Sequence, residues 1–130
     1  MDAYVAAYPE VHPLAQSQDQ DFDVLRAKQD AGAVAAITQF FTDAEVFLRF
    51  RYACVARRIT LPLIPGILPI DNWVLTQRMA KQCAVSVAPD LAEGFARAQR
   101  EDRAHLMGVA HATELCDRLI REGVGHLHFY

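Results

Sequence analysis

The chain has 130 residues, 52% of them hydrophobic and 22% charged, which is typical of one globular domain and excludes a disordered chain. Lys and Arg number 13 against 16 Asp and Glu, and the resulting net charge of −3 argues against a nucleic-acid partner. No apolar run is long enough to span a bilayer and the first residues do not resemble a signal peptide, so we expect no membrane partner and a cytoplasmic location.

The first half of the chain predicts two strand–helix units. A short apolar strand is expected at residues 4–7, followed after a loop by a helix at residues 17–31 with Gly32 as its C-terminal stop. A second apolar strand is expected at residues 34–39. Residues 42–45 (Thr-Asp-Ala-Glu) have the spacing of a capping box and predict the start of the next helix.

The second half continues the same pattern. Residues 59–65 are apolar and β-branched and predict a third strand, after which Asp71 or Asn72 caps a helix. Pro89 can open a short helix in a less regular stretch. Residues 103–122 carry apolar positions at the helical period and predict the longest helix.

Residues 126–130 predict a final strand, which brings the total to about four strand–helix units without a hairpin signal. Strands that alternate with helices pair in parallel through right-handed crossovers, so the fold class is α/β. The strands are apolar on both faces, which is typical of a barrel or a doubly wound sheet. A complete (β/α)8 barrel takes ~250 residues, so this chain would form about half of one, with open strand edges.

Polar and aromatic side chains follow the predicted strands, at the end of the sheet where parallel α/β proteins place their ligands. They are Tyr8, Glu10, His12, Thr38, Gln39, Phe40 and Phe41, with a rigid turn at residues 65–69. This rim would suit a planar aromatic ligand. The alternative is that the prolines stiffen loops and the two phenylalanines belong to the core.

Other patterns indicate no chemistry. The three cysteines lie far apart and predict buried thiols, and His126 and His128 have no partner at a metal-ligand spacing, so we expect neither disulfide nor metal. Gly123 and Gly125 precede a strand and do not form a dinucleotide-binding fingerprint. The charged run at residues 97–103 is mixed in sign and predicts a solvated helix face.

Seven short motifs stand in an order and at a spacing that resemble the methylenetetrahydrofolate reductase family. They are residues 5–13 (VAAYPEVHP), 30–33 (DAGA), 37–41 (ITQFF), 47–51 (FLRFR), 64–69 (IPGILP), 121–124 (REGV) and 128–130 (HFY). The resemblance spans essentially the whole chain and covers the second half of the family's catalytic barrel. It implies that residues 1–130 form a single truncated domain, a partial (β/α)8 (TIM) barrel of about four β-α units.

The resemblance also implies an activity and a set of ligands. The family uses NAD(P)H and a bound FAD to reduce 5,10-methylenetetrahydrofolate to 5-methyltetrahydrofolate. Tyr8 and His12 match its flavin-contacting loop, and Asp21 and Lys28 match positions that hold the FAD ribose and pyrophosphate portion. Gln39 matches the glutamine that meets the nicotinamide or the folate.

The chain departs from the family at four positions. Val24 and Ala27 replace polar cofactor contacts, and Leu75 and Met79 replace a substrate glutamine and an aromatic near the flavin. No residue here matches the family's proton donor, so we expect no catalytic residue and an inactive isolated chain.

Two other hypotheses remain open. The chain could be a half-barrel binding or structural module that associates with itself, as a homo-oligomer, or with a complementary half-barrel chain. It could also be a decayed gene product without function.

Overall fold

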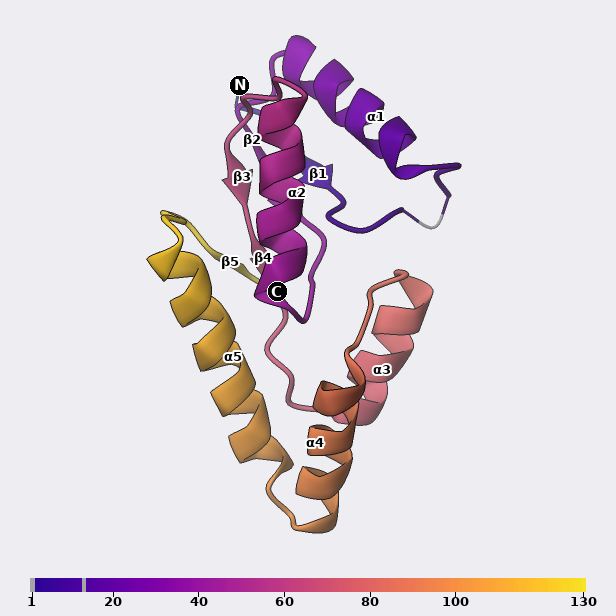
Figure 1. Ribbon diagram of the computed structural model, residues 1–130, viewed down its shortest axis with the longest axis vertical. Helices are drawn as coiled ribbons and strands as arrows, with labels where there is room; N and C mark the ends of the chain where they lie inside the picture. Colours follow the sequence, from indigo (N-terminus) through magenta and orange to yellow (C-terminus); the bar gives the residue numbers. More distant parts are fainter. Residues whose placement is uncertain (1, 13) are drawn as a thin grey trace.

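The computed structural model describes residues 2–12 and 14–130. Within these ranges the chain forms five helices and five short strands (Figure 1). In chain order they are β1 (Tyr4–Ala7), α1 (Gln18–Asp30), β2 (Ala35–Thr38), α2 (Ala44–Ala56), β3 (Leu63–Ile64), β4 (Gly66–Ile67), α3 (Trp73–Gln82), α4 (Pro89–Arg100), α5 (Ala104–Arg121) and β5 (His128–Phe129).

All strand pairs in the described ranges are parallel. One sheet has the order β1-β2-β3, with Val5 opposite Ala36 and Ala36 opposite Leu63. A second sheet pairs β4 with β5, with Gly66 opposite His128. Helices separate β1 from β2, β2 from β3 and β4 from β5, while β3 and β4 follow each other directly, and the predicted α/β class is confirmed.

The third strand is shorter than predicted. Residues 59–65 were expected to form one strand, but β3 covers only Leu63 and Ile64, and β4 begins after Pro65. Proline has no N–H to donate to a ladder, so the strand is interrupted there and continues in the second sheet. Ile59 and Leu61 precede the strand and are buried in the core instead.

The five helices of the described ranges begin near their predicted N-termini, with one correction to a cap. The hydroxyl of Ser17 accepts the N–H of Gln20 at 3.2 Å, and Asn72 caps α3. Asp43, not Thr42, caps α2: its carboxylate accepts the N–H of Glu45 at 2.9 Å. The capping-box prediction was wrong because the Thr42 hydroxyl bonds elsewhere, to the carbonyl of Ser86.

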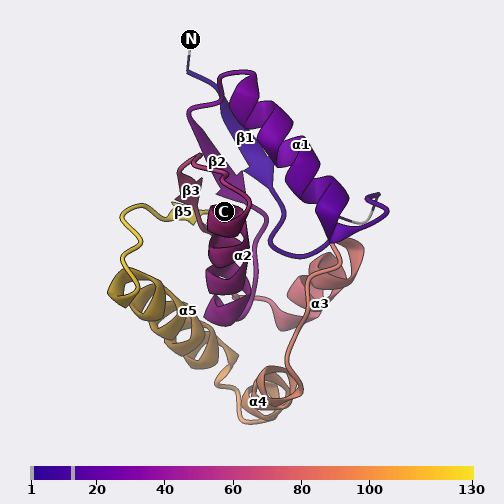
Figure 2. The same cartoon turned by 45° about the horizontal axis from the view of Figure 1, so that its top comes forward.

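Helices α1 and α2 cover one face of the first sheet. In each strand, the side chains of every second residue face these helices and pack with Phe22 of α1 and Phe50 of α2. The rings of these two phenylalanines stack, with their centroids 5.6 Å apart. Figures 1 and 2 both show α1 beside β1, with the α3–α4–α5 segment at the opposite end of the molecule from the N-terminus.

The other face of the first sheet is partly open. Tyr4 is 60% exposed, Ala6 is exposed, and Ile37 and Ile64 are half-buried. These are the alternate positions of the strands, pointing away from α1 and α2. Part of this strand face is thus left in contact with solvent, although Ala35, which lies on the same face, is buried.

Thr38 joins the two sheets. It is fully buried, and its hydroxyl accepts the backbone N–H of Gly66 at 2.9 Å. The Tyr130 hydroxyl donates to the Thr38 carbonyl at 2.7 Å. Gly66 has to lack a side chain, because a Cβ there would lie 2.2 Å from the Thr38 carbonyl oxygen and 2.6 Å from Tyr130 Cε2.

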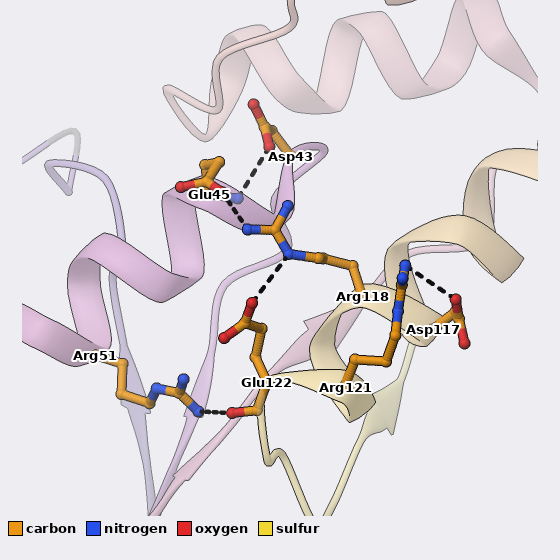
Figure 3. A network of polar contacts seen from close by, with 7 residues as sticks. All are labelled: Asp43, Glu45, Arg51, Asp117, Arg118, Arg121 and Glu122. Carbon is orange, nitrogen blue, oxygen red and sulfur yellow. Dashed lines mark hydrogen bonds and ion pairs between the residues drawn. The ribbon is translucent and has the colours of Figure 1, made fainter.

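Helix α5 is held to α2 by exposed polar contacts as well as by core packing. Arg118 pairs with Glu45 of α2 and with Glu122, 3.4 Å away, while Arg51 of α2 donates to the Glu122 carbonyl at 2.9 Å (Figure 3). Exposed ion pairs contribute little to stability. The buried contacts of Leu115 and Leu119 with Phe47 and Ile67 therefore carry the packing of α5.

Gly108 lets α5 approach the loop before α3. A Cβ at this position would lie 1.9 Å from the Ile70 carbonyl oxygen, which is backbone and cannot move aside cheaply. Helix propensity alone predicts that Gly108→Ala stabilises the protein by about 1 kcal/mol. The steric conflict predicts the opposite sign, a loss of about 1–3 kcal/mol in the free energy of unfolding.

Urea unfolding checks this prediction. Gly125→Ala is the matched control, because a Cβ at Gly125 meets nothing within 4 Å. We expect that control to change stability by no more than about 0.5 kcal/mol. A Gly108→Ala protein as stable as the parent, or more stable, would contradict the described packing.

The Tyr130 contact predicts a pH dependence. Burial, and to a lesser degree the nearby Tyr8 phenol, raise the pKa of Tyr130 above its ordinary value. The folded state therefore holds this proton more tightly than the unfolded chain. The contribution of Tyr130 to stability is complete below the ordinary tyrosine pKa of about 10 and is lost as the pH rises through the folded pKa.

Phenolate absorbance during an alkaline titration tests this. Subtracting the curve of Tyr130→Phe from that of the parent isolates one tyrosine, and its midpoint is expected above pH ~10. A midpoint at or below that value would show that the hydroxyl is not held at Thr38.

Candidate functional site

A cavity of about 330 Å³ lies at the carboxyl end of β1, between the loop that follows this strand and helix α1. That volume is at the lower end of the range for small-molecule sites, so it suits a part of a large ligand. Its walls are formed by Ala6, Ala7, Tyr8, His12, Leu14, Ala15, Gln20, Asp21, Val24, Leu25, Lys28 and Phe50. The four residues expected to contact FAD are all among them.

Tyr8 and His12 pack against each other across the loop. Their ring centroids are 4.3 Å apart and the rings meet edge to face at 78°. The backbone N–H of Leu14 donates to His12 Nδ1 at 3.0 Å. Nδ1 is thus an acceptor, which places the proton of a neutral His12 ring on Nε2.

Asp21 ties this loop to the first turn of α1. Its Oδ2 accepts the backbone N–H of His12 at 2.9 Å. Acidic side chains are favoured in the first turn, where they meet the positive end of the helix dipole. The second carboxylate oxygen, Oδ1, is not used in the bond to His12.

Lys28 approaches the cavity from the last turn of α1. Its ammonium donates to the Ala6 carbonyl at 2.9 Å and lies 5.9 Å from the centroid of the Tyr8 ring, within the range of a cation–π contact. An ammonium has three donors, and the bond to Ala6 takes one. Among the described residues that line the cavity, Lys28 is the only Lys or Arg.

Gln39 lies elsewhere. It follows β2 and its backbone N–H donates to the Ala7 carbonyl at 2.8 Å, so it is one strand away from Tyr8 at the same edge of the sheet. Its side-chain Oε1 accepts the neighbouring Phe40 N–H at 3.2 Å. The structure therefore does not bring Gln39 into the cavity with the other four residues.

Phe40 and Phe41 do not form a ligand rim. They are 4% and 2% exposed, and Phe41 stacks on Phe47 at 5.6 Å between ring centroids. The prediction of an aromatic rim was wrong for these two residues, and the alternative that they belong to the core is confirmed. Among the aromatic residues of the expected rim, only Tyr8 lines the cavity.

Two further wall residues were not predicted from the sequence. Gln20 accepts the N–H of Gln16 at 2.7 Å while its own N–H bonds to Ser17, a reciprocal capping arrangement whose Ser-x-x-Gln spacing could have been recognised. Phe50 comes from α2 and reaches the cavity only through tertiary packing, for which the sequence holds no local signal.

A larger cavity of about 660 Å³ lies at the amino ends of the strands, with Tyr4, Arg58 and His126 among its walls. It is twice the volume of the first but sits at the wrong end of a parallel sheet for a ligand site. The smaller cavity, at the carboxyl end, is therefore the stronger candidate.

The described residues show neither a metal site nor an activated thiol. No group of three His, Cys, Asp or Glu side chains in residues 2–12 and 14–130 is placed to hold a metal ion. Cys54 is buried as predicted, and this burial raises its pKa to about 11, so the thiol is protonated and unreactive at neutral pH. Cys83 and Cys116 are half-buried.

No helix in the described part of the chain is both long and apolar enough to cross a membrane. The charged side chains of residues 97–103 are exposed, as predicted, but only Arg97 and Arg100 lie on a helix, because α4 ends at Arg100 and residues 101–103 form the turn before α5.

Comparison with solved structures supports the fold. A structure titled "Uncharacterized protein from Clostridium thermocellum binds two copies of 5-methyl-5,6,7,8-tetrahydrofolic acid" superposes with a TM-score of 0.60. The match covers 97% of this chain and 45% of that one, at 16% sequence identity. At this identity the likeness concerns the fold alone.

Comparison with known sequences assigns the family. The chain is 43% identical over 130 residues to the 5,10-methylenetetrahydrofolate reductase of Escherichia coli (strain K12), and 44% identical to that of Pectobacterium carotovorum. Each match covers 99% of this chain but only 44% of the relative, so the chain spans less than half the length of these enzymes. Methylenetetrahydrofolate reductase (NADH) 1 of Arabidopsis thaliana is 35% identical, over 97% of this chain and 23% of its own length. The family model "Methylenetetrahydrofolate reductase" matches residues 1–130, and the chain therefore belongs to this family.

Proposed function

We propose that the cavity at the carboxyl end of β1 binds part of FAD, and that the chain forms half of a methylenetetrahydrofolate reductase. The observation that carries this proposal is the convergence of Tyr8, His12, Asp21 and Lys28 on one cavity, although they come from a loop and from both ends of α1. Each of them matches a family position for the cofactor.

The proposed architecture is four consecutive units of a (β/α)8 barrel, in a single domain of residues 1–130. Its support is the parallel pairing of the strands and the helices that separate β1 from β2, β2 from β3 and β4 from β5. The partly open strand face, with Tyr4 and Ala6 exposed, would then correspond to the barrel interior. In a whole barrel that interior is filled by side chains from all eight strands.

The cavity residues fit the polar portion of a dinucleotide. Lys28 would use its remaining donors on the pyrophosphate, and Asp21 would use Oδ1 on a ribose hydroxyl. Tyr8 and His12 offer a ring surface beside them. Because Lys28 is the only cation among the described wall residues, and Val24 lines the same cavity, we expect weaker binding than in relatives with more polar contacts.

When bound, FAD supplies the hydride chemistry, while the chain binds and orients it. NAD(P)H is the proposed hydride donor and a folate is the proposed acceptor. A folate is also the ligand named for the Clostridium thermocellum protein. Gln39 would meet either ring with its amide after giving up its bond to the Phe40 N–H.

Catalysis would require residues outside this segment. None of the 130 residues matches the family's general acid, so we propose that the chain alone performs no reduction.

The cytoplasmic location expected from the sequence stays a prediction.

A fluorescence titration with FAD tests the cofactor site. We expect saturable binding to the parent chain and a loss of about tenfold or more in Lys28→Ala, because a hydrogen bond to a charged group contributes about 1.5–3 kcal/mol. Lys81→Ala is the matched control, since Lys81 lies exposed in the last turn of α3, away from the cavity walls.

A folded parent chain that shows no saturable binding would contradict the proposal. Equal losses in Lys28→Ala and Lys81→Ala would also contradict it, because they would indicate general charge attraction and not a site.

A second candidate function rests on the open strand face. A half-barrel with Tyr4, Ala6, Ile37 and Ile64 in contact with solvent would gain by covering them with a second copy or with a complementary half-barrel chain. In this role the chain would be a binding or structural module.

Sedimentation velocity over a range of concentrations tests the association. We expect the parent to form a dimer or larger species, and Ala6→Lys to shift it toward monomer, because the new charge would stand on the open face. Tyr52→Lys is the control: Tyr52 is 78% exposed on α2, which covers the opposite face. A parent that stays monomeric throughout would rule out self-association.

A further inference from the structure

A chain of hydrogen bonds outside the cavity joins three loops. Ser86, between α3 and α4, bonds to Glu10 in the loop after β1 and to Thr42 in the loop after β2. Ser86, Glu10 and Thr42 are not among the residues that line the cavity at the carboxyl end of β1. Loops far apart in the sequence are thus connected beside the site.

Ser86 uses all three of its polar groups in these contacts. Its backbone N–H lies 3.1 and 3.2 Å from the two carboxylate oxygens of Glu10, and its hydroxyl donates to Oε1 of the same carboxylate. Its carbonyl accepts the hydroxyl of Thr42 at 2.9 Å. Bonds to a carboxylate are stronger than bonds between neutral groups, so the contact with Glu10 is the stronger of the two.

The network continues to α5 on the far side. Nε2 of His111 lies 2.8 Å from the Thr42 carbonyl, and Thr42 itself is buried. The exposed Ser86 is therefore bonded to a buried residue on one side and to Glu10 on the other.

Glu10 lies midway between Tyr8 and His12. The loop that carries both rings is consequently held at two places, at Glu10 by Ser86 and at His12 by Asp21. The ring centroids of Tyr8 and His12, on either side of Glu10, lie 4.3 Å apart. Of the two contacts, only Asp21 lies in the cavity wall and matches a family position for the cofactor.

We propose that Glu10 and Ser86 are positioning residues, which hold the loop so that Tyr8 and His12 face the ligand. This inference rests on the proposed function, since it takes the cavity as the ligand site. It assigns a role to two residues that touch no ligand themselves and act through the rings on either side of Glu10.

Two readouts test the proposal. The first readout is the FAD titration. Glu10→Ala removes every bond between residue 10 and Ser86 and is expected to weaken FAD binding roughly fivefold or more, a typical size for coupling between sites. Ser86→Ala is expected to weaken FAD binding less, because the backbone N–H of residue 86 remains. Ser86→Thr is expected to bind FAD like the parent, because threonine retains the hydroxyl. Glu93→Ala, at an exposed glutamate of α4, is the matched control and should leave binding unchanged.

The second readout needs no FAD. The edge-to-face contact with Tyr8 shifts the NMR signals of the His12 ring protons, and Glu10→Ala should move them toward the values of Tyr8→Ala. If the parent chain binds no FAD but Glu10→Ala moves the His12 signals, the proposed function is overturned and the positioning role stays intact. Unmoved His12 signals in Glu10→Ala would overturn the positioning role.

A double-mutant cycle distinguishes positioning of the rings from a purely structural role of the contact between Glu10 and Ser86. If Glu10 acts through the rings, its removal should weaken FAD binding much less in a Tyr8→Ala background than in the parent. An equal loss in both backgrounds would overturn the proposal. Urea unfolding of each variant confirms that folded proteins are compared.

Discussion

The arrangement of this chain depends on the buried residue Thr38. The strand that should continue from β3 is interrupted at Pro65, which has no N–H for the ladder, and the Thr38 hydroxyl accepts the next N–H, that of Gly66. Its carbonyl also accepts the hydroxyl of Tyr130. One residue thereby connects the three-stranded sheet to the two-stranded one, and a Cβ at Gly66 would collide with both the Thr38 carbonyl oxygen and the Tyr130 ring.

Because the strands pair in parallel, their carboxyl ends lie at a common end of the sheet. The loop after β1 and Gln39 after β2 lie there, and the candidate cavity lies between that loop and α1. The loops themselves are tied together by Glu10 and Ser86, and the loop after β1 is tied to α1 by Asp21. A site made of loop residues can be well ordered when each loop is bonded to its neighbours, and this is the physical basis of the proposed FAD site.

Much of this arrangement could be predicted from local patterns. The strand at residues 4–7, the start of α1 next to Ser17 and its stop at Gly32, whose φ is +98°, all follow from properties of single residues or short runs. Two cavity residues of α1, Asp21 and Lys28, were predicted from the family resemblance. Their spacing along the helix brings Asp21 and Lys28, two turns apart, to the same side.

The rest required tertiary information. Thr42 and Asp43 both have capping side chains, and only the contact with Ser86 decides that Asp43 caps α2. The burial of Phe40 and Phe41 depends on helices that follow much later in the chain. Ser86 lies in a stretch without a strong pattern, and its bond to Glu10, 76 residues away, has no local signal.

The most direct test of the account is an NMR map of backbone amide shifts during titration with FAD. If the cavity at the carboxyl end of β1 is the cofactor site, signals of residues 6–8, 12, 14, 15 and 20–28 should shift in a saturable way. Signals from the larger cavity at the amino ends of the strands, residues 58–61, 63, 64 and 123–126, should stay in place. Shifts confined to that larger cavity, or none in a folded chain, would contradict the account.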